Sequence, residues 1–255
     1  MAVNQSLQTI AQLMAKNKHT VVVTGAGIST EAGVPDFRGK QGIYHQLGED
    51  RVMNLIHTST LHEDPETFFS FYRKYFTLPR VEPSKAHKMV AAMEAAGLVK
   101  AVVTQNVDEL HQKAGSRNVF AIHGSRAHYH CMKVTCGKSF SADYAENYPE
   151  TVPRCDTCGS VIRPGTVLFG EAIKYHGEAL DAVLQAKVLL VIGTSLTVYP
   201  LAGFVQSFRQ SNDKLIIINQ GSTALDHLAY CKYDAPHTGD ALEEILGIAS
   251  AITGN

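Results

Sequence analysis

Four of the five cysteines in this 255-residue chain lie close together, at positions 131, 136, 155 and 158. Structural zinc sites commonly use two short loops that each carry a pair of thiolate ligands. The pair Cys131 and Cys136 and the pair Cys155 and Cys158 therefore predict a tetrahedral zinc site. Four thiolates leave no coordination position for water or substrate, so we expect a structural zinc ion.

Three further residues bear on the predicted zinc site, namely two nearby histidines and the fifth cysteine. The first pair has four residues between its cysteines, which leaves open that His128 or His130 replaces Cys131 as a ligand. Cys231 has no nearby partner in the sequence, and we expect it to be buried. An odd number of cysteines, most of them local, argues against a secreted disulfide framework.

Among twelve histidines, His123 has the sequence context of a catalytic residue. It follows the apolar run 119–122 and precedes Gly124, which places it at the carboxyl end of a predicted strand. Open α/β sheets bind their ligands at that edge. A neutral imidazole accepts a proton near pH 7, so His123 is the predicted general base.

A glycine loop follows the first apolar run of the chain. Gly25 and Gly27 permit a tight turn whose backbone N–H groups can face a phosphate. The third glycine of the dinucleotide fingerprint is missing, so the loop alone does not distinguish nucleotide binding from an ordinary turn. Asp36, Phe37 and Arg38 follow in a second turn, and an ordinary surface turn would not require that combination.

Other predicted strands also end in small or polar residues. Asn106 and Asp108 can bind a ribose or a carboxamide, although Asp108 could instead cap the next helix. Gly193 and Asn219 follow two later strands. Together these strand ends define one polar edge, where a dinucleotide lies across such a sheet.

The elements that must position these residues follow from hydrophobic patterning. Runs that are apolar at nearly every position predict strands covered on both faces, as in a parallel sheet. They lie at 20–24, 101–104, 119–122, 188–192 and 215–218. Helical patterns lie at 7–14, 66–76, 85–96 and 179–187. The alternation predicts an α/β fold with a doubly wound, Rossmann-like parallel sheet.

A small inserted zinc-ribbon domain interrupts this alternation. Residues 128–164 are rich in Cys, Pro, Tyr and polar turns. We therefore expect a large Rossmann-like domain made of 1–127 and 165–255, with 128–164 as a small inserted module; the family resemblance described below implies that the first binds NAD and that the second is a zinc ribbon. The segment 40–83 is expected to form a helical and loop layer of the small domain.

Composition excludes several classes of protein. The chain is 45% hydrophobic and 18% charged, with a formal net charge of -1, which is typical of an ordinary globular protein. The charge gives no basis for binding nucleic acid or anionic lipid. No apolar run approaches the length of a membrane span, and the N-terminus lacks a secretory signal pattern, so a cytoplasmic protein is expected.

The motifs taken together resemble the sirtuins, the NAD-dependent protein lysine deacylases. The resemblance rests on GAGIST and PDFRG within 25–39, TQN-D within 104–108, HG at 123–124, the two cysteine pairs, FGE at 169–171 and GTSL-V-P within 193–200. It covers about residues 20–240 in the order of the family. It implies an NAD-binding domain, a zinc-ribbon domain and an acyl-lysine peptide bound between them.

The resemblance also implies roles for single residues. His123 and Asn106 would be the catalytic residues. The cofactor-binding set would be Gly25, Ala26, Gly27, Ile28, Thr30, Asp36, Phe37, Arg38, Gln105, Asn106, Asp108, Gly193, Thr194, Ser195, Asn219 and Ala241. The substrate backbone would pair as an added strand with Val167, Phe169, Gly170, Glu171 and Val198.

The implied reaction transfers an acetyl group from lysine to ADP-ribose. The acetyl oxygen attacks the anomeric carbon of the nicotinamide ribose, nicotinamide leaves, and His123 activates a ribose hydroxyl. Members that prefer succinyl-lysine carry a Tyr-x-x-Arg pair, but here Tyr75 follows Tyr72 at the arginine position. Acetyl-lysine is therefore the expected substrate, with Arg73 pointing into solvent.

Three other functions fit parts of the sequence. An NAD-dependent dehydrogenase or an ADP-ribosyltransferase would use the same phosphate loop and sheet. A dehydrogenase accounts poorly for the cysteine pairs and for PDFRG. A non-enzymatic zinc-ribbon binding module would account for the cysteines alone, and the segment 128–164 lacks the basic, aromatic-interleaved pattern of nucleic-acid binding.

Overall fold

The computed structural model describes residues 5–37, 42–77, 80–211 and 214–254. Its main element is a six-stranded sheet in the order β3-β2-β1-β7-β8-β9, in which all neighbours pair in parallel. The strands are β1 (Thr20–Thr24), β2 (Val99–Thr104), β3 (Val119–Ala121), β7 (Val188–Ile192), β8 (Leu215–Ile218) and β9 (Cys231–Tyr233). This confirms the predicted α/β fold and its parallel sheet.

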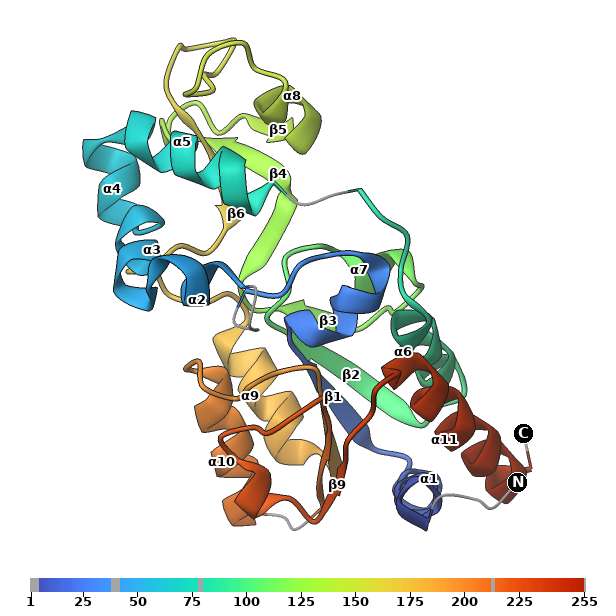
Figure 1. Ribbon diagram of the computed structural model, residues 1–255. Helices are drawn as coiled ribbons and strands as arrows, with labels where there is room; N and C mark the ends of the chain where they lie inside the picture. The colour runs from blue at the N-terminus through green and yellow to red at the C-terminus, as the bar shows by residue number, and fades with distance from the viewer. Residues whose placement is uncertain (1–4, 38–41, 78–79, 212–213, 255) are drawn as a thin grey trace.

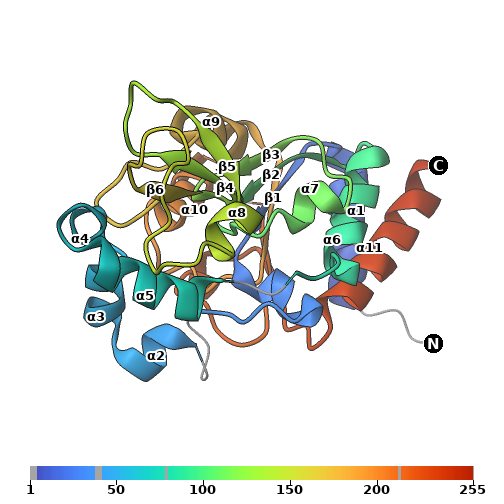
Figure 2. The same ribbon diagram turned by 90° about the horizontal axis from the view of Figure 1, so that it is seen from above.

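Helices cover both faces of this sheet, which explains why its central strands are apolar at every position. On one face lie α1 (Gln5–Asn17), α6 (Lys85–Ala95) and α11 (Thr238–Thr253), packed against strand residues such as Val22 and Leu190 (Figure 2). On the other face lie α9 (His176–Gln185) and α10 (Leu201–Ser211), packed against the alternate residues Val23 and Val191.

Side chains cap the N-termini of two helices. The side chain of Asp64 accepts a hydrogen bond from the Thr67 N–H at the start of α5 (Pro65–Phe76), and Ser84 does the same for His87 at the start of α6. Strand β9 was not predicted, because its residues Cys-Lys-Tyr do not form a continuous apolar run. The expectation that Cys231 is buried is wrong: it lies in this edge strand and is half-buried.

A second, smaller unit lies beyond the carboxyl edge of the large sheet (Figure 1). Its antiparallel sheet has the order β5-β4-β6, formed by β5 (Ser139–Ser141), β4 (Gly124–Cys131) and β6 (Ile162–Thr166). The accompanying helices are α2 (Ile43–Leu47), α3 (Glu49–Leu55), α4 (Thr58–Glu63), α5 and α8 (Ala142–Glu146). One apolar cluster joins α2 to α5 to the small sheet, including Phe68 of α5 and Tyr129 of β4.

The remaining elements are short: the 3-10 helix η1 (Ala26–Ala32), α7 (Leu110–Lys113) and the 3-10 helix η2 (Asp226–Leu228). Among the described residues, none of the helices has both the length and the apolar character needed to cross a bilayer.

Candidate functional site

A cavity of about 520 Å³ lies at the carboxyl edge of the large sheet and is lined by residues of both units. It opens at the neighbouring strands β1 and β7, where the strand order reverses direction, with β2 and β3 on one side and β8 and β9 on the other. Ligands of open α/β sheets bind at this topological switch point. Most residues implied by the sirtuin resemblance line the cavity: Gly25, Ala26, Gly27, Thr30, Asp36, Phe37, Gln105, Asn106, Asp108, His123, Val167, Phe169, Gly170, Glu171, Gly193, Thr194, Ser195, Val198 and Asn219.

Three expected residues are not part of this lining. Ile28 and Ala241 are buried in the apolar cluster between the sheet and α1, α6 and α11. Their small exposed fractions, 1% and 5%, leave little side-chain surface for a ligand. Arg38 lies outside the described residues.

The two glycine loops at the switch point touch each other. The Gly27 N–H donates a 2.8 Å hydrogen bond to the Gly193 oxygen, and a Cβ atom on Gly27 would lie 2.7 Å from the Gly193 Cα. Gly193 also has a φ of +61°, which a side chain would strain. Glycine at both positions therefore lets the backbone itself form the floor of the cavity.

Asn106 and Asp108 are held in place by Ser29 on η1. The Asn106 Nδ2 donates to the Gly25 oxygen and to the Ser29 Oγ, each at 3.1 Å. The Ser29 hydroxyl in turn donates to Asp108 Oδ2 at 2.7 Å, and the Leu110 N–H donates to Asp108 Oδ1. Asp108 therefore accepts a hydrogen bond from the first residue of α7 and also lines the cavity.

His123 lies in the turn between β3 and β4, half-buried at the cavity wall. Its Nδ1 is 3.1 Å from the backbone oxygen of Gln105. A carbonyl oxygen can only accept, so Nδ1 carries the proton and Nε2 has the free electron pair. Burial lowers the pKa of His123 below the usual 6.5, although the Gln105 hydrogen bond acts in the opposite direction. The ring is therefore neutral near pH 7 and can accept a proton at Nε2.

Two buried histidines beneath the cavity were missed by the sequence analysis. His87 contacts Ser84 through Nδ1 at 2.7 Å and Ser29 through Nε2 at 3.4 Å. His111 contacts Thr24 through Nε2 at 3.0 Å, and its Nδ1 has no partner among the described residues. No sequence motif indicated the contacts with Ser29 and Thr24, since these join segments that are far apart along the chain.

The segment after β6 forms the wall toward the small unit. The Thr58 N–H donates to the Phe169 oxygen at 2.9 Å, and the Val167 N–H donates to the His123 oxygen at 2.8 Å. Nη1 and Nη2 of Arg163 donate to the two carboxylate oxygens of Glu171. These contacts hold the turn 167–171 against both units.

Aromatic and hydroxyl groups line the cavity where it reaches α5. Tyr72 and Phe76 stack with ring centroids 5.5 Å apart, and the Tyr72 hydroxyl is 3.4 Å from the Thr166 hydroxyl. Burial raises the pKa of Tyr72 to about 12, so its hydroxyl is uncharged near pH 7. The expectation that Arg73 points into solvent is wrong: it donates to the backbone oxygens of Ala145, Tyr148 and Glu150 near the end of α8.

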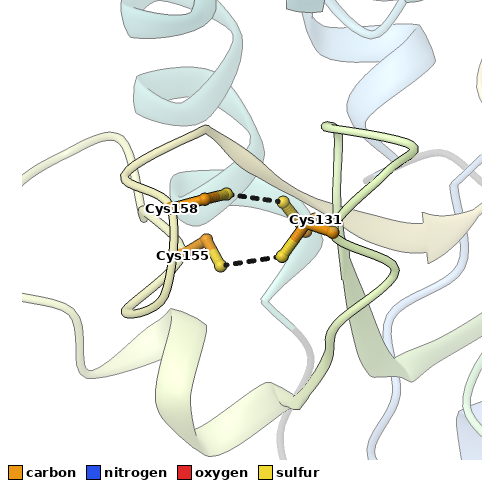
Figure 3. A group of neighbouring side chains, drawn as sticks. Cys131, Cys155 and Cys158 are labelled. Carbon is orange, nitrogen blue, oxygen red and sulfur yellow. Dashed lines mark hydrogen bonds between the residues drawn. The ribbon is translucent and has the colours of Figure 1, made fainter.

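The four predicted cysteine ligands meet in the small unit. All four sulfur atoms lie within 4.8 Å of one another. The Cys131 and Cys158 sulfurs are 3.5 Å apart, and the Cys136 and Cys155 sulfurs are 3.7 Å apart (Figure 3). Zinc with four Zn–S bonds of about 2.3 Å requires sulfurs about 3.8 Å apart, so this cluster fits a tetrahedral zinc ion.

The alternative histidine ligands have other partners. The Nε2 of His128 faces Glu109 at 3.8 Å, and the Nδ1 of His130 faces the Ser139 hydroxyl at 3.1 Å. Among the described residues, the metal-ligand group near these positions contains the four cysteines alone. The wider first loop therefore does not require a histidine ligand.

Comparison with known proteins agrees with this geometry. The model of the Sir2 family matches residues 25–200. The NAD-dependent protein deacetylase of Clostridium acetobutylicum is 39% identical, covering 88% of this chain and 91% of the relative. The protein of the same name from Thermotoga maritima is 37% identical, covering 89% and 92%.

Solved structures show the same relationship in three dimensions. A Sir2 structure with a deacetylated p53 peptide and 3′-O-acetyl ADP-ribose matches with a TM-score of 0.87 and 34% identity, covering 95% of this chain and 98% of the other. A Sir2 structure with a p53 peptide and NAD+ matches with a TM-score of 0.81 and 33% identity, covering 98% and 99%. This chain belongs to the Sir2 family.

Proposed function

We propose that the chain is an NAD-dependent protein lysine deacetylase. It transfers the acetyl group of an acetylated lysine to ADP-ribose and releases nicotinamide and O-acetyl-ADP-ribose. The observation that carries this proposal is the neutral His123, whose Nε2 is free at a cavity that also reaches the glycine loops. The relatives carry this activity in their names, and a matched Sir2 structure holds the two products of such a transfer.

The proposed NAD site extends along the carboxyl edge of the large sheet. NAD supplies an anomeric carbon that loses nicotinamide and accepts the acetyl oxygen. The backbone of Gly25, Gly27 and Gly193 lies where it can approach phosphates closely, which supports a dinucleotide at this edge. Thr194, Ser195 and Asn219 extend the same wall toward β8, where we place the adenosine half.

The remaining expected cofactor contacts lie on the other side of the glycine loop. We assign Ala26, Thr30, Asp36 and Phe37 to the nicotinamide half, because they line the cavity beside η1. The Thr194 hydroxyl donates to Gln105 Oε1 at 3.3 Å, so Gln105 joins the two halves of the proposed site.

Two residues act on the reacting groups in this proposal. His123 accepts a proton from a ribose hydroxyl at Nε2, while the Gln105 oxygen keeps Nδ1 protonated. Asn106 uses its Nδ2 to bind Gly25 and Ser29, which directs its side-chain oxygen toward the cavity as an acceptor. Both are proposed catalytic residues.

The acetyl-lysine peptide is proposed to lie between the two units. Val167, Phe169, Gly170 and Glu171 on one side and Val198 on the other provide exposed or half-exposed backbone along the cavity. A peptide that adds as a strand gains affinity from main-chain hydrogen bonds and requires little of the substrate sequence. Its lysine side chain would reach Tyr72 and Phe76.

The zinc ion has a structural role in this proposal. Cys131, Cys136, Cys155 and Cys158 would hold it and so connect the loops of the small sheet.

We further propose that the chain divides into two domains. Residues 1–127 and 165–255 form the NAD-binding domain, and residues 128–164 form a zinc-ribbon module with 40–83 as its helical layer. The joint apolar cluster of α2 to α5 and the small sheet supports this layer. A cytoplasmic location, without nucleic acid or membrane as partners, stays a prediction from the sequence.

Nicotinamide release tests the proposed activity. The protein is incubated with NAD and an acetyl-lysine peptide, with the unacetylated peptide as the matched control. Release that needs the acetyl group, together with formation of O-acetyl-ADP-ribose, supports the deacetylase. Reduction of NAD would indicate a dehydrogenase, stable attachment of ADP-ribose to protein an ADP-ribosyltransferase, and no turnover a binding module; each contradicts the proposal.

A further inference from the structure

A second cavity, of about 350 Å³, adjoins the active-site cavity. The two share Thr166, Val167 and Glu171 as lining residues. The second cavity then extends to three basic side chains, namely those of His130, Arg163 and Lys174. It is thus a basic recess directly beside the segment proposed to bind the substrate peptide.

The charge of Arg163 is already compensated. Its Nη1 and Nη2 donate to the two carboxylate oxygens of Glu171, and Nη2 also donates to the Thr166 oxygen at 3.0 Å. Burial acts to raise the pKa of Glu171, but the hydrogen bonds from Arg163 and from the Leu168 N–H keep it below the usual value. Glu171 is therefore an ionised carboxylate, and its negative charge compensates the positive charge of Arg163.

The charge of Lys174 is not compensated in this way. Its Nζ donates to the backbone oxygen of Gly165 at 3.1 Å, a partner that carries no net charge. Among the ion pairs of the described residues, none includes Lys174. The backbone N–H of Lys174 donates to the Ile122 oxygen at 2.9 Å. This hydrogen bond fixes the backbone of Lys174 close to His123, the residue that follows Ile122.

The position of the ammonium group is also defined. A Cβ atom on Gly124 would lie 3.3 Å from the Lys174 Nζ, so the charge rests against the Gly124 backbone. A Cβ atom on Gly165 would lie 3.2 Å from the His130 Nε2, which directs that imidazole to the same segment. The recess therefore combines one free positive charge with an imidazole at a fixed place.

We propose that this recess binds an acidic side chain of the substrate peptide, close in sequence to the acetylated lysine. The inference rests on the proposed function and adds a substrate preference to it. An extended peptide rises about 3.3 Å per residue, so side chains one or two positions from the lysine lie within about 7 Å along the strand. A carboxylate on one of these flanking side chains would pair with Lys174. It would lie across the recess from the carboxylate of Glu171, which is already bound by Arg163.

The test uses acetyl-lysine peptides that differ at one flanking position at a time. Each peptide carries either Glu or the neutral isostere Gln at that position. We expect a KM about threefold to fivefold lower for Glu at one position and a similar kcat, as for a partly exposed ion pair. Lys174→Gln should remove this difference, Lys174→Arg should keep it, and Lys174→Glu should reverse it, so that the Gln peptide has the lower KM.

Lys113→Gln is the matched control, because Lys113 is an exposed lysine of α7 outside both cavities. It should leave the preference unchanged. Equal KM values for the Glu and Gln peptides at every position would overturn the inference. So would a Lys174→Gln variant that loses activity equally on both peptides, because Lys174 would then act only through Gly165.

Inorganic phosphate, added at constant ionic strength, distinguishes a peptide side chain from a free anion. Competition against the Glu peptide alone supports the inference. Thermal stabilisation by phosphate without any effect on peptide choice would mean that the recess takes a free anion, which contradicts it. Turnover of the Gln peptide by the unchanged protein tests the proposed function separately, so failure of one proposal can be told from failure of the other.

Discussion

The imidazole rings of His87 and His111 meet edge to face with centroids 4.8 Å apart, and both are buried beneath the active-site cavity. Burial lowers the pKa of His87 to about 4, although Asp108 acts to raise it. Burial, with a smaller contribution from His87, lowers the pKa of His111 to about 3. Both rings are therefore neutral in the folded protein at pH 7.

Acidification should unfold the protein through this pair. A histidine whose folded pKa is lowered contributes stability above its unfolded pKa of about 6.5, and that stability is lost as the pH falls toward the folded value. At pH 5 the expected loss is about 2 kcal/mol for each ring. Urea unfolding at pH 7.5 and pH 5 measures it.

His111→Gln separates the contribution of this ring from other acid effects. The variant should be less stable at pH 7.5, but its loss of stability between pH 7.5 and 5 should be smaller by about 2 kcal/mol. His62→Gln, which removes an exposed histidine, serves as the control. The same pH dependence in His111→Gln and the unchanged protein would rule out His111 as a source.

His123→Asn should remove the general base. We expect deacetylation to fall by at least about 100-fold, the usual contribution of a general base, while NAD binding and folding persist. Single-turnover kinetics with an acetyl-lysine peptide and NAD titration measure the two effects, with His62→Asn as the control. Near-full turnover by His123→Asn would exclude this residue from the mechanism.

The pH dependence of kcat/KM should report the lowered pKa of His123. Only the neutral ring accepts a proton, so activity should fall as the pH drops through the pKa of the folded protein. Burial places that pKa below 6.5, and the acid limb should therefore have its midpoint below pH 6.5. A midpoint above pH 6.5 would contradict the assignment.

One zinc ion per chain is expected, and its removal should unfold the small unit. Elemental analysis should find one zinc, and Cys155→Ser should reduce zinc content and thermal stability. Cys231→Ser is the matched control, because Cys231 lies in β9 of the large sheet, outside the cluster. A chelated protein that keeps its full melting temperature would refute the structural role.

Acetyl-lysine should be preferred over succinyl-lysine by at least about tenfold in kcat/KM, which corresponds to about 1.4 kcal/mol. Burial of an unpaired carboxylate costs several kcal/mol. The cavity end offers the uncharged hydroxyls of Tyr72 and Thr166, while Arg73 is bound to carbonyl oxygens near α8. Kinetics on one peptide with each acyl group measure the preference, and equal turnover would show that a cation reaches the pocket.

Local sequence patterns were sufficient to predict the parallel sheet, the polar strand ends at its edge and the cysteine cluster. Continuous apolar runs such as Val188–Ile192 specify strands buried on both faces, because a strand with one solvated face would alternate. The spacing of the cysteines predicted that their sulfur atoms form a cluster, because each pair lies in a short local turn. These features depend on neighbours in the chain, so local patterns reveal them.

The partners of the charged and hydrogen-bonding side chains could not be predicted from local patterns, because they depend on how distant segments pack. Arg73 binds oxygens more than 70 positions away, His87 joins Ser29, and Lys174 rests against Gly124. A side chain at a given helix position can turn toward solvent or toward another element, and only the packing of distant segments selects between them. The sequence therefore predicts where the active-site edge lies, whereas the fold determines which residues hold His123 and Asp108 in place and which charge stays free beside them.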